Sequence, residues 1–164
     1  SAAMEDVFID LVNGTASGIE IGSDTISGFE AAVGGAGDDY FRASAATPAL
    51  LEGGLGQNTF EFTQEAVAAV AVFEIADFKA GDTVKMKKYD ILEKVIGEFE
   101  DEFAKIYGEH GDEDDVRIRD RNEYNDAAAT DRTVIEADFD RDDTYETTIL
   151  LNGRYVLVIV EAVA

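Results

Sequence analysis

Glycine-rich turns at a fixed spacing constrain the fold of this chain more than any other feature. Residues 34–42 and 53–61 both follow the nine-residue pattern G-G-x-G-x-D-x-U-x, in which U is a large apolar residue. The second copy has Asn58 where the first has Asp39. A shorter copy around Asp24 keeps only the G-x-D-x-U core. A repeat of this kind is typical of a parallel β-helix whose turns bind calcium.

The pattern has a direct physical explanation. Glycine allows φ > 0 and close backbone approach, so a six-residue turn can direct several carbonyl oxygens at one point. The aspartate adds a carboxylate there, and residue U points inward from a short strand. Two strands and two turns form one coil of about 18 residues. The separation of Gly34 and Gly53 corresponds to one coil with a single inserted residue, so the two turns are expected to stack.

Stacked turns of this composition predict a Ca²⁺ site, because Ca²⁺ accepts roughly six to eight carbonyl and carboxylate oxygens. Asp24 is expected to serve a further site with a neighbouring turn. Asp77 and Asp82 either cap the last site or are simple turn residues. The alternative is that these positions no longer bind calcium and that the glycines serve only to form the turns of a solenoid. The other predicted ligands are the carbonyls of Gly34, Gly35, Ala36, Gly37, Gly53, Gly54 and Gly56 and the side chains of Asp39 and Asn58.

Charge and composition exclude several classes of function. The 164 residues include 36 acidic and 13 basic side chains, a formal net charge of −23. This charge disfavours nucleic acid and anionic membrane surfaces as partners and favours cations. There is no cysteine and one histidine, His110, which excludes disulfides, thiolate zinc sites and two-histidine zinc motifs. No run of 18 apolar residues is present, so no membrane span is expected.

Composition divides the chain near residue 62. Most of the glycines precede this point, and nearly all the basic residues follow it. Residues 90–107 have apolar side chains at intervals of three and four, which predicts an amphipathic helix. Asn152-Gly153 predicts a two-residue hairpin. Strands are predicted at 59–63, 67–78, 83–87, 116–119, 133–139, 147–151 and 155–160.

The expected fold is therefore mainly β. Residues 1–62 are predicted to form a short parallel β-roll (β-solenoid) with glycine-rich calcium turns. Residues 63–164 are predicted to form a C-terminal β-rich cap that contains one amphipathic α-helix.

A second acidic motif spans residues 138–146. Its D-x-D-x-D run resembles the start of an EF-hand calcium loop. However, Asp143 stands where that loop has glycine, and Ile149 stands where it needs a bidentate glutamate. Because strands are predicted on both sides, we interpret this run as a solvated acidic turn. The carboxylates of residues 112–115 are interpreted as a solvated face.

These motifs resemble the RTX (repeats-in-toxin) family, specifically the C-terminal end of bacterial proteins exported by type I secretion. Residues 22–39 look like the beginning of such repeats. Residues 53–62, followed by 75–84, look like the exit from the roll into the cap that serralysin-type proteases and the calcium-binding modules of alginate epimerases share. Residues 133–144 resemble a later strand and turn of that cap.

The resemblance implies a calcium-binding module with no catalysis of its own, secreted from a bacterium or held at its surface. Crowded carboxylates repel one another, so the calcium-free roll is expected to be unstable. It would stay loose in the calcium-poor cytosol, interact with the type I secretion machinery, and fold on extracellular calcium. Residues 156–164 resemble the uncleaved export signal of such proteins, and as a strand they are equally compatible with a core position.

Two other functions are weighed against this one. The first is a calcium-dependent carbohydrate-binding or adhesion module with an extracellular polysaccharide as partner. Exposure of rings among Tyr40, Phe41, Phe60 and Phe62 would favour it, and their burial would not. The second is a hydrolase that uses acidic residues near His110, which would need a cleft around residues 110–115.

Overall fold

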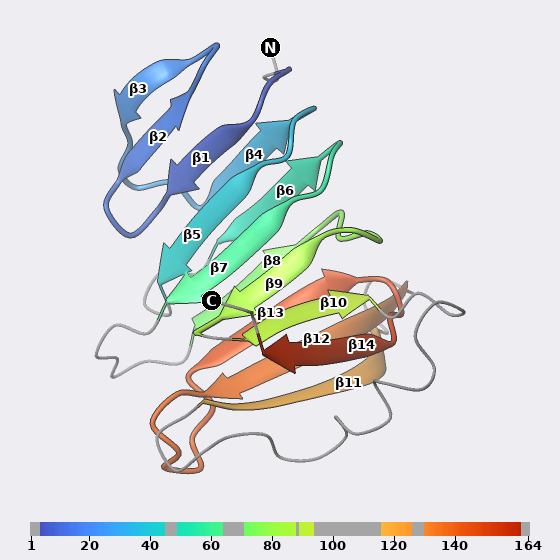
Figure 1. Cartoon of the computed structure of the whole chain (residues 1–164). Helices are drawn as coiled ribbons and strands as arrows, with labels where there is room; N and C mark the ends of the chain where they lie inside the picture. The colour runs from blue at the N-terminus through green and yellow to red at the C-terminus, as the bar shows by residue number, and fades with distance from the viewer. Residues whose placement is uncertain are drawn as a thin grey trace.

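The chain forms two β-sheets in the part that its computed structural model describes, namely residues 4–44, 49–63, 71–87, 89–93, 116–125 and 130–161 (Figure 1). Both sheets are mixed, and these ranges contain no α-helix. Accordingly, no helix able to cross a membrane is found among the described residues.

The two sheets differ in size. In spatial order, the larger sheet consists of β14 (Leu157–Glu161), β10 (Tyr89–Glu93), β9 (Thr83–Met86), β7 (Thr59–Thr63), β5 (Tyr40–Ser44), β1 (Val7–Asp10), β2 (Thr15–Gly18) and β3 (Gly22–Thr25). The smaller sheet consists of β11 (Arg117–Asn125), β12 (Thr130–Asp138), β13 (Thr147–Asn152), β8 (Ala71–Ile75), β6 (Leu50–Gly54) and β4 (Ala31–Gly35).

From β4 to β9 the chain passes to the other sheet at every strand. In the smaller sheet β4, β6 and β8 run parallel, and in the larger sheet so do β5, β7 and β9, like successive rungs (Figure 1). Tyr40 pairs with Thr59. These two residues are as far apart in the sequence as Gly34 and Gly53, the first glycines of the two nonapeptides, so the strands are in the register that the spacing of the repeats predicts. Thr59 pairs with Thr83, so the alternation continues beyond residue 62 with a longer coil.

The core lies between the two sheets, because alternate residues of each strand point inward. On β7 the inward residues are Phe60 and Phe62, both almost completely buried. The Phe60 ring stacks on Phe41 of β5, with centroids 5.1 Å apart. Phe62 meets Phe73 of β8 edge-on at 4.8 Å, which joins the two sheets. The U positions of both nonapeptides, Phe41 and Phe60, are therefore core residues, as the pattern predicts.

Charged side chains of alternating sign lie in register across the larger sheet. Arg42 of β5 forms ion pairs of 3.5 Å with both Asp10 of β1 and Glu61 of β7. Glu61 is in turn aligned with Lys85 of β9, and Lys85 with Asp90 of β10. Opposite charges on neighbouring strands stabilise a sheet. In this row Arg42 and Lys85 alternate with three carboxylates, so that no two of these carboxylates are direct neighbours across the sheet.

The predicted helix over residues 90–107 is wrong at its beginning. Residues 89–93 form β10, which pairs antiparallel with both β9 and β14. Ile91 is buried and Asp90 less so, so this segment alternates with a period of two. Hydrogen bonds to two neighbouring strands satisfy its backbone, and this tertiary pairing overrides the local helical pattern. The rest of the predicted helix, from residue 94, lies outside the described residues.

The predicted hairpin at Asn152-Gly153 is also wrong. β13 ends in the smaller sheet and pairs with β12, whereas β14 pairs with β10 in the larger sheet. The chain therefore crosses between sheets here. Tyr155 stabilises the crossing, because its hydroxyl donates to the carbonyl of Phe78 and also lies 3.0 Å from the carbonyl oxygen of Asn152.

Most of the other predicted strands are present. The predictions for residues 59–63, 83–87, 133–139 and 147–151 correspond to β7, β9, β12 and β13. The strand predicted at 116–119 is longer and forms β11, and that at 155–160 begins later, as β14. Of the strand predicted at 67–78, residues 71–75 form β8.

Replacement of Phe60 by alanine should destabilise the fold strongly. The ring is fully buried against Phe41, so its loss leaves a cavity and should lower the free energy of unfolding by about 3–5 kcal/mol. Phe29→Ala is a matched control, since that ring is 53% exposed and should contribute little. Urea unfolding monitored by circular dichroism would compare them, and equal effects would contradict the assignment of the core.

Candidate metal centre at the stacked turns

Three six-residue turns connect the alternating strands and stack at one edge of the molecule. They span residues 34–39 before β5, 53–58 before β7, and 77–82 before β9, and the first two residues of the first two turns are also the last residues of β4 and β6. The strand registers make them equivalent position by position, because Tyr40, Thr59 and Thr83 are aligned. The third turn reads Asp-Phe-Lys-Ala-Gly-Asp and lacks the nonapeptide pattern, although its Asp77 and Asp82 are among the predicted ligands; the strand pairing makes it a member of the stack.

The sixth residue of each turn links that turn to the preceding coil. Asp39 Oδ1 accepts the N–H of Val7 at 2.9 Å, Asn58 Oδ1 accepts that of Asp39 at 3.0 Å, and Asp82 Oδ1 accepts that of Asn58 at 2.8 Å. Asp39, Asn58 and Asp82 are each at most 1% exposed. Since a buried backbone N–H must be paired, these side chains hold the coils in register.

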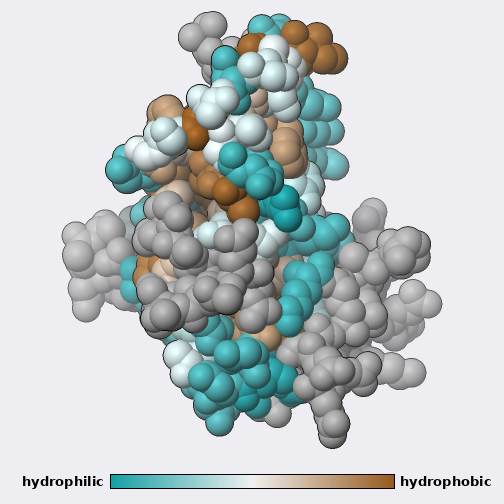
Figure 2. Space-filling model, turned by 90° about the vertical axis from the view of Figure 1, so that its left-hand side faces the viewer, coloured by the Kyte–Doolittle hydropathy of each residue, from teal (hydrophilic) through white to brown (hydrophobic). Residues whose placement is uncertain are grey.

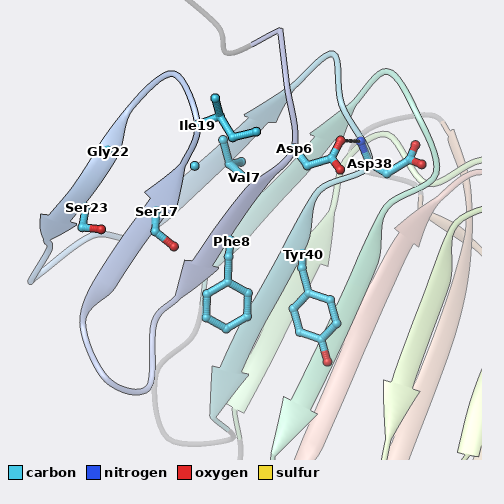
Figure 3. Close-up of a pocket in the computed structure, with 10 residues that line it drawn as sticks. Asp6, Val7, Phe8, Ser17, Ile19, Gly22, Ser23, Asp38 and Tyr40 are labelled. Carbon is cyan, nitrogen blue, oxygen red and sulfur yellow. Dashed lines mark hydrogen bonds between the residues drawn. The ribbon is translucent and has the colours of Figure 1, made fainter.

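The fifth residue forms a second series of contacts in the opposite direction. Asp6 accepts the N–H of Asp38 at 2.8 Å, and Asp38 accepts the N–H of Gln57 at 2.7 Å. Figure 3 shows the first of these contacts, between Asp6 beside β1 and Asp38 beside β5. The sequence patterns missed this role of Asp6, Asp38 and Gln57, because the fifth position of the repeat is written as any residue.

Asp77 caps the second turn from the third. Its two carboxylate oxygens accept the N–H groups of Gly53 and Gly54 at 2.8 and 2.6 Å. Asp77 therefore contacts the backbone of the neighbouring turn, and its role as a cap on the last calcium site stays a prediction. Its charge-assisted hydrogen bonds go to backbone groups.

One oxygen of Asp39 has no hydrogen-bond partner of normal geometry, and the Gly35 N–H is the backbone donor near this carboxylate besides that of Val7. Asp39 Oδ2 is buried, although Oδ1 is bound to Val7. Burial raises the pKa of Asp39, and the neighbouring carboxylates of Asp6 and Asp38 act in the same direction. The nearby N–H groups of Val7 and Gly35 oppose this shift of the pKa without reversing it. A buried carboxylate oxygen without a partner is costly, so this position favours either a proton or a cation.

The glycines of the turns leave room for these oxygens. A Cβ at Gly34 would overlap the Asp39 carboxylate and would lie 2.7 Å from the Gly53 carbonyl oxygen. Asp39 Oδ2 and the Gly53 carbonyl therefore border the same space. In the second turn Gly54 and Gly56 have φ values of 85° and 76°, and a Cβ at either would overlap a carbonyl of the first turn.

Two oxygens at the first turn are of the type that calcium binds, out of the roughly six to eight that the ion accepts. A buried carboxylate oxygen and backbone carbonyls are hard ligands of the kind that Ca²⁺ prefers. Asp39 Oδ2 and the Gly53 carbonyl would hold the ion, and the cation would supply the positive charge that the buried carboxylate lacks. In the third turn Asp82 is instead paired with the Lys79 ammonium, at 3.2 Å.

The predicted ligands fall into two groups. The structure brings eleven of them into the three turns: Gly34, Gly35, Ala36, Gly37, Asp39, Gly53, Gly54, Gly56, Asn58, Asp77 and Asp82. It leaves Asp24 apart, exposed on β3, with β2 and β1 between it and β5. The G-x-D-x-U core at Asp24 belongs to an antiparallel hairpin, because β3 pairs with β2.

A second group of carboxylates converges in the turn between β12 and β13. Oxygens of Asp138, Asp140, Asp142 and Glu146 lie within 4.8 Å of one another. Asp138 is fully buried, and Asp140 and Asp142 are exposed. The group has the oxygen chemistry of a hard-cation site. Its members already accept backbone N–H groups, among them that of Phe139, which Glu146 accepts at 2.8 Å. The turn is the one predicted, with one of its carboxylates in the interior.

The aromatic rings near the turns are mostly internal. Phe41, Phe60 and Phe62 are at most 1% exposed, so the exposed strip that would favour a carbohydrate-binding surface is not formed by them. Tyr40 is half-buried and lies beside Phe8 in a shallow hollow on the outer face of β1 and β5 (Figure 3). Figure 2 shows hydrophobic side chains as separate patches in the upper part of the molecule and mainly hydrophilic ones below.

Comparison of the chain with models of known protein families, with curated proteins and with solved structures found no match. His110 and residues 112–115 lie outside the described residues. The candidate metal centre therefore rests on the geometry of the turns.

Replacement of Gly34 by alanine should disrupt the first turn. The added methyl group would overlap the Asp39 carboxylate, and such overpacking should lower the free energy of unfolding by about 1–3 kcal/mol. Ala36→Ser is a control within the same turn, because it adds a single atom to a residue that already carries a Cβ. Thermal unfolding of the two variants would test this, and a Gly34→Ala protein as stable as the wild type would contradict the packing described.

Proposed function

We propose that this chain is an RTX-type calcium-binding module of an exported bacterial protein, which folds on extracellular calcium and has no catalysis of its own. The observation that carries the proposal is the buried and unpartnered Asp39 Oδ2 beside the Gly53 carbonyl. In this interpretation the alternating strands β4 to β9 form a β-roll, and the strands after β9 form its cap. This roll differs in extent from the one predicted for residues 1–62, since it continues past residue 62 and leaves out β1 to β3, which pair antiparallel with one another.

The charge of the chain supports the same proposal. A net charge of −23 disfavours the compact state through self-repulsion. Asp6, Asp38 and Asp39 bring three carboxylates to the first turn, and the turn has no basic residue of its own. A cation that binds only the folded state would add roughly 2.7 kcal/mol when its concentration exceeds the Kd a hundredfold. One such site can therefore decide the folding of a marginal domain.

Secretion would use this dependence on calcium. In a compartment poor in free calcium the carboxylates remain unneutralised, and the chain stays loose enough to pass through a type I secretion channel. Outside the cell, calcium would fill the site and fold the module, which would then stabilise the exported protein that carries it. The predicted localisation is accordingly extracellular or at the cell surface.

Calcium should raise the melting temperature of the wild type. It should bind more weakly to the Asp39→Asn variant and raise its melting temperature less. Asparagine occupies the equivalent position of the second turn, where its side-chain oxygen accepts a backbone N–H. The variant should therefore keep the hydrogen bond to Val7 and lose only the charge. Calorimetric titration of chelator-treated protein with CaCl₂, together with melting curves up to about 10 mM calcium, would measure both effects.

Two controls make this experiment specific. Asp24→Asn removes an exposed carboxylate on β3, outside the three turns, and should bind calcium as the wild type does. Asp140→Asn reports separately on the acidic turn between β12 and β13. If Asp39→Asn responds to calcium in the same way as the wild type, the proposed site is wrong.

Without calcium, the fold should gain stability from Asp39 as the pH falls through its raised folded-state pKa towards the ordinary aspartate value of 3.8. The folded-state pKa of this group is raised by burial, so the folded protein takes up the proton at a higher pH than the unfolded chain. Its destabilising effect therefore appears as the pH rises through the folded-state pKa. The difference in melting temperature between wild type and Asp39→Asn in EDTA, measured against pH, isolates this group. A difference that does not change with pH would contradict the prediction.

A further inference from the structure

The three sixth-position side chains differ in how their second polar atom is satisfied. In the first turn Asp39 Oδ2 has no partner. In the second turn the equivalent atom is the amide nitrogen of Asn58, which donates to the Leu55 carbonyl of the same turn at 3.2 Å. In the third turn Asp82 Oδ2 accepts the N–H of Lys79 at 3.0 Å and lies 3.4 Å from its ammonium.

The Lys79 ammonium is bound as a metal cation would be. Its Nζ lies 2.8 Å from the Gly54 carbonyl oxygen of the second turn and 3.2 Å from Asp82 Oδ1 of the third. It therefore joins two neighbouring turns through a backbone carbonyl and a buried carboxylate. The Asp82 side chain is 0% exposed, and that of Lys79 is 37% exposed, so the charged end reaches inward from the surface.

Lys79 occupies a position that is apolar in the other turns. It is the third residue of its turn, equivalent to Leu55 and Ala36. Neither of these can supply a charge. At the junction of the first and second turns, the Gly35 carbonyl instead accepts the N–H of Leu55 at 2.8 Å. The third turn therefore contains a cationic side chain, Lys79, and the second contains a neutral amide donor, Asn58.

We infer that the second and third turns are independent of calcium, because the Asn58 amide replaces the carboxylate oxygen that would need a cation and the Lys79 ammonium takes the place of the cation itself, and that the first turn is the calcium site of the stack. This inference rests on the proposed function for its first-turn site. It adds that the number of ions bound by the turns is set by two substitutions within the repeat: asparagine for aspartate, and lysine for an apolar residue.

Two substitutions would convert the second and third turns, whose polar atoms are paired within the protein, into calcium sites. Asn58→Asp replaces the donor amide by a carboxylate of the same shape and recreates the arrangement of the first turn. Lys79→Met removes the ammonium, keeps most of the apolar stem, and leaves Asp82 with its backbone partners alone. Each variant should melt at a lower temperature than the wild type in EDTA. Each should also bind about one more calcium ion per chain than the wild type and regain stability on binding it.

Calorimetric titration with CaCl₂ would measure the stoichiometry of wild type, Asn58→Asp, Lys79→Met and Lys85→Met. Lys85→Met is the matched control, because Lys85 lies on β9 in the charged row and not in a turn. The control should bind as many ions as the wild type. Counting differences between proteins also removes any contribution from residues 138–146.

The outcomes separate this inference from the proposed function. If wild type loses an ion on Asp39→Asn but neither Asn58→Asp nor Lys79→Met gains one, the inference is wrong and the proposed function stands. If the two variants gain ions while Asp39→Asn loses none, the proposed first-turn site is wrong and the inference about the other two turns holds. A Lys79→Met protein that is as stable as the wild type in EDTA would also overturn the role of the ammonium.

Discussion

A buried polar side chain at the sixth position of each turn is the contact on which the rest of the structure depends. Asp39, Asn58 and Asp82 each pair a backbone N–H of the preceding coil that would otherwise be buried without a partner. Because these contacts join equivalent positions, they hold β5, β7 and β9 in one register. That register in turn brings the phenylalanine rings of successive strands into contact and aligns the charged row on the outer face.

The same contact creates an electrostatic problem. A carboxylate used as a hydrogen-bond acceptor in the interior has a second oxygen that must also be satisfied. The chain meets this requirement differently in each turn. Asn58 has an amide in place of that oxygen, and Asp82 has the ammonium of Lys79. Asp39 is left with neighbouring carboxylates, which makes the first turn the point at which the folding of an acidic chain can depend on a cation.

Local patterns predicted the elements that repeat and failed at those that depend on distant partners. The two nonapeptides indicated stacked turns with inward Phe41 and Phe60, because glycine and alternation act within a short stretch of chain. The segment that begins at Asp90 has helical spacing, yet its first residues are a strand between two others. Asn152-Gly153 is a common hairpin sequence, yet the strands on either side belong to different sheets. Pairing across the molecule outweighed local preference at both places.

The amino-acid sequence by itself determined the composition of the first two turns, the need for glycine in them, and the choice of Asp39 as the acid of the first turn. Only the tertiary structure decided which other residues join them. The third turn, residues 77–82, has no nonapeptide signature and enters the stack because β9 pairs with β7, with Thr83 beside Thr59. Asp24 matches the motif but lies on an antiparallel hairpin at the sheet edge. The physical reason is that a motif specifies local backbone geometry, whereas a site needs oxygens from separate coils, and strand register alone brings those together.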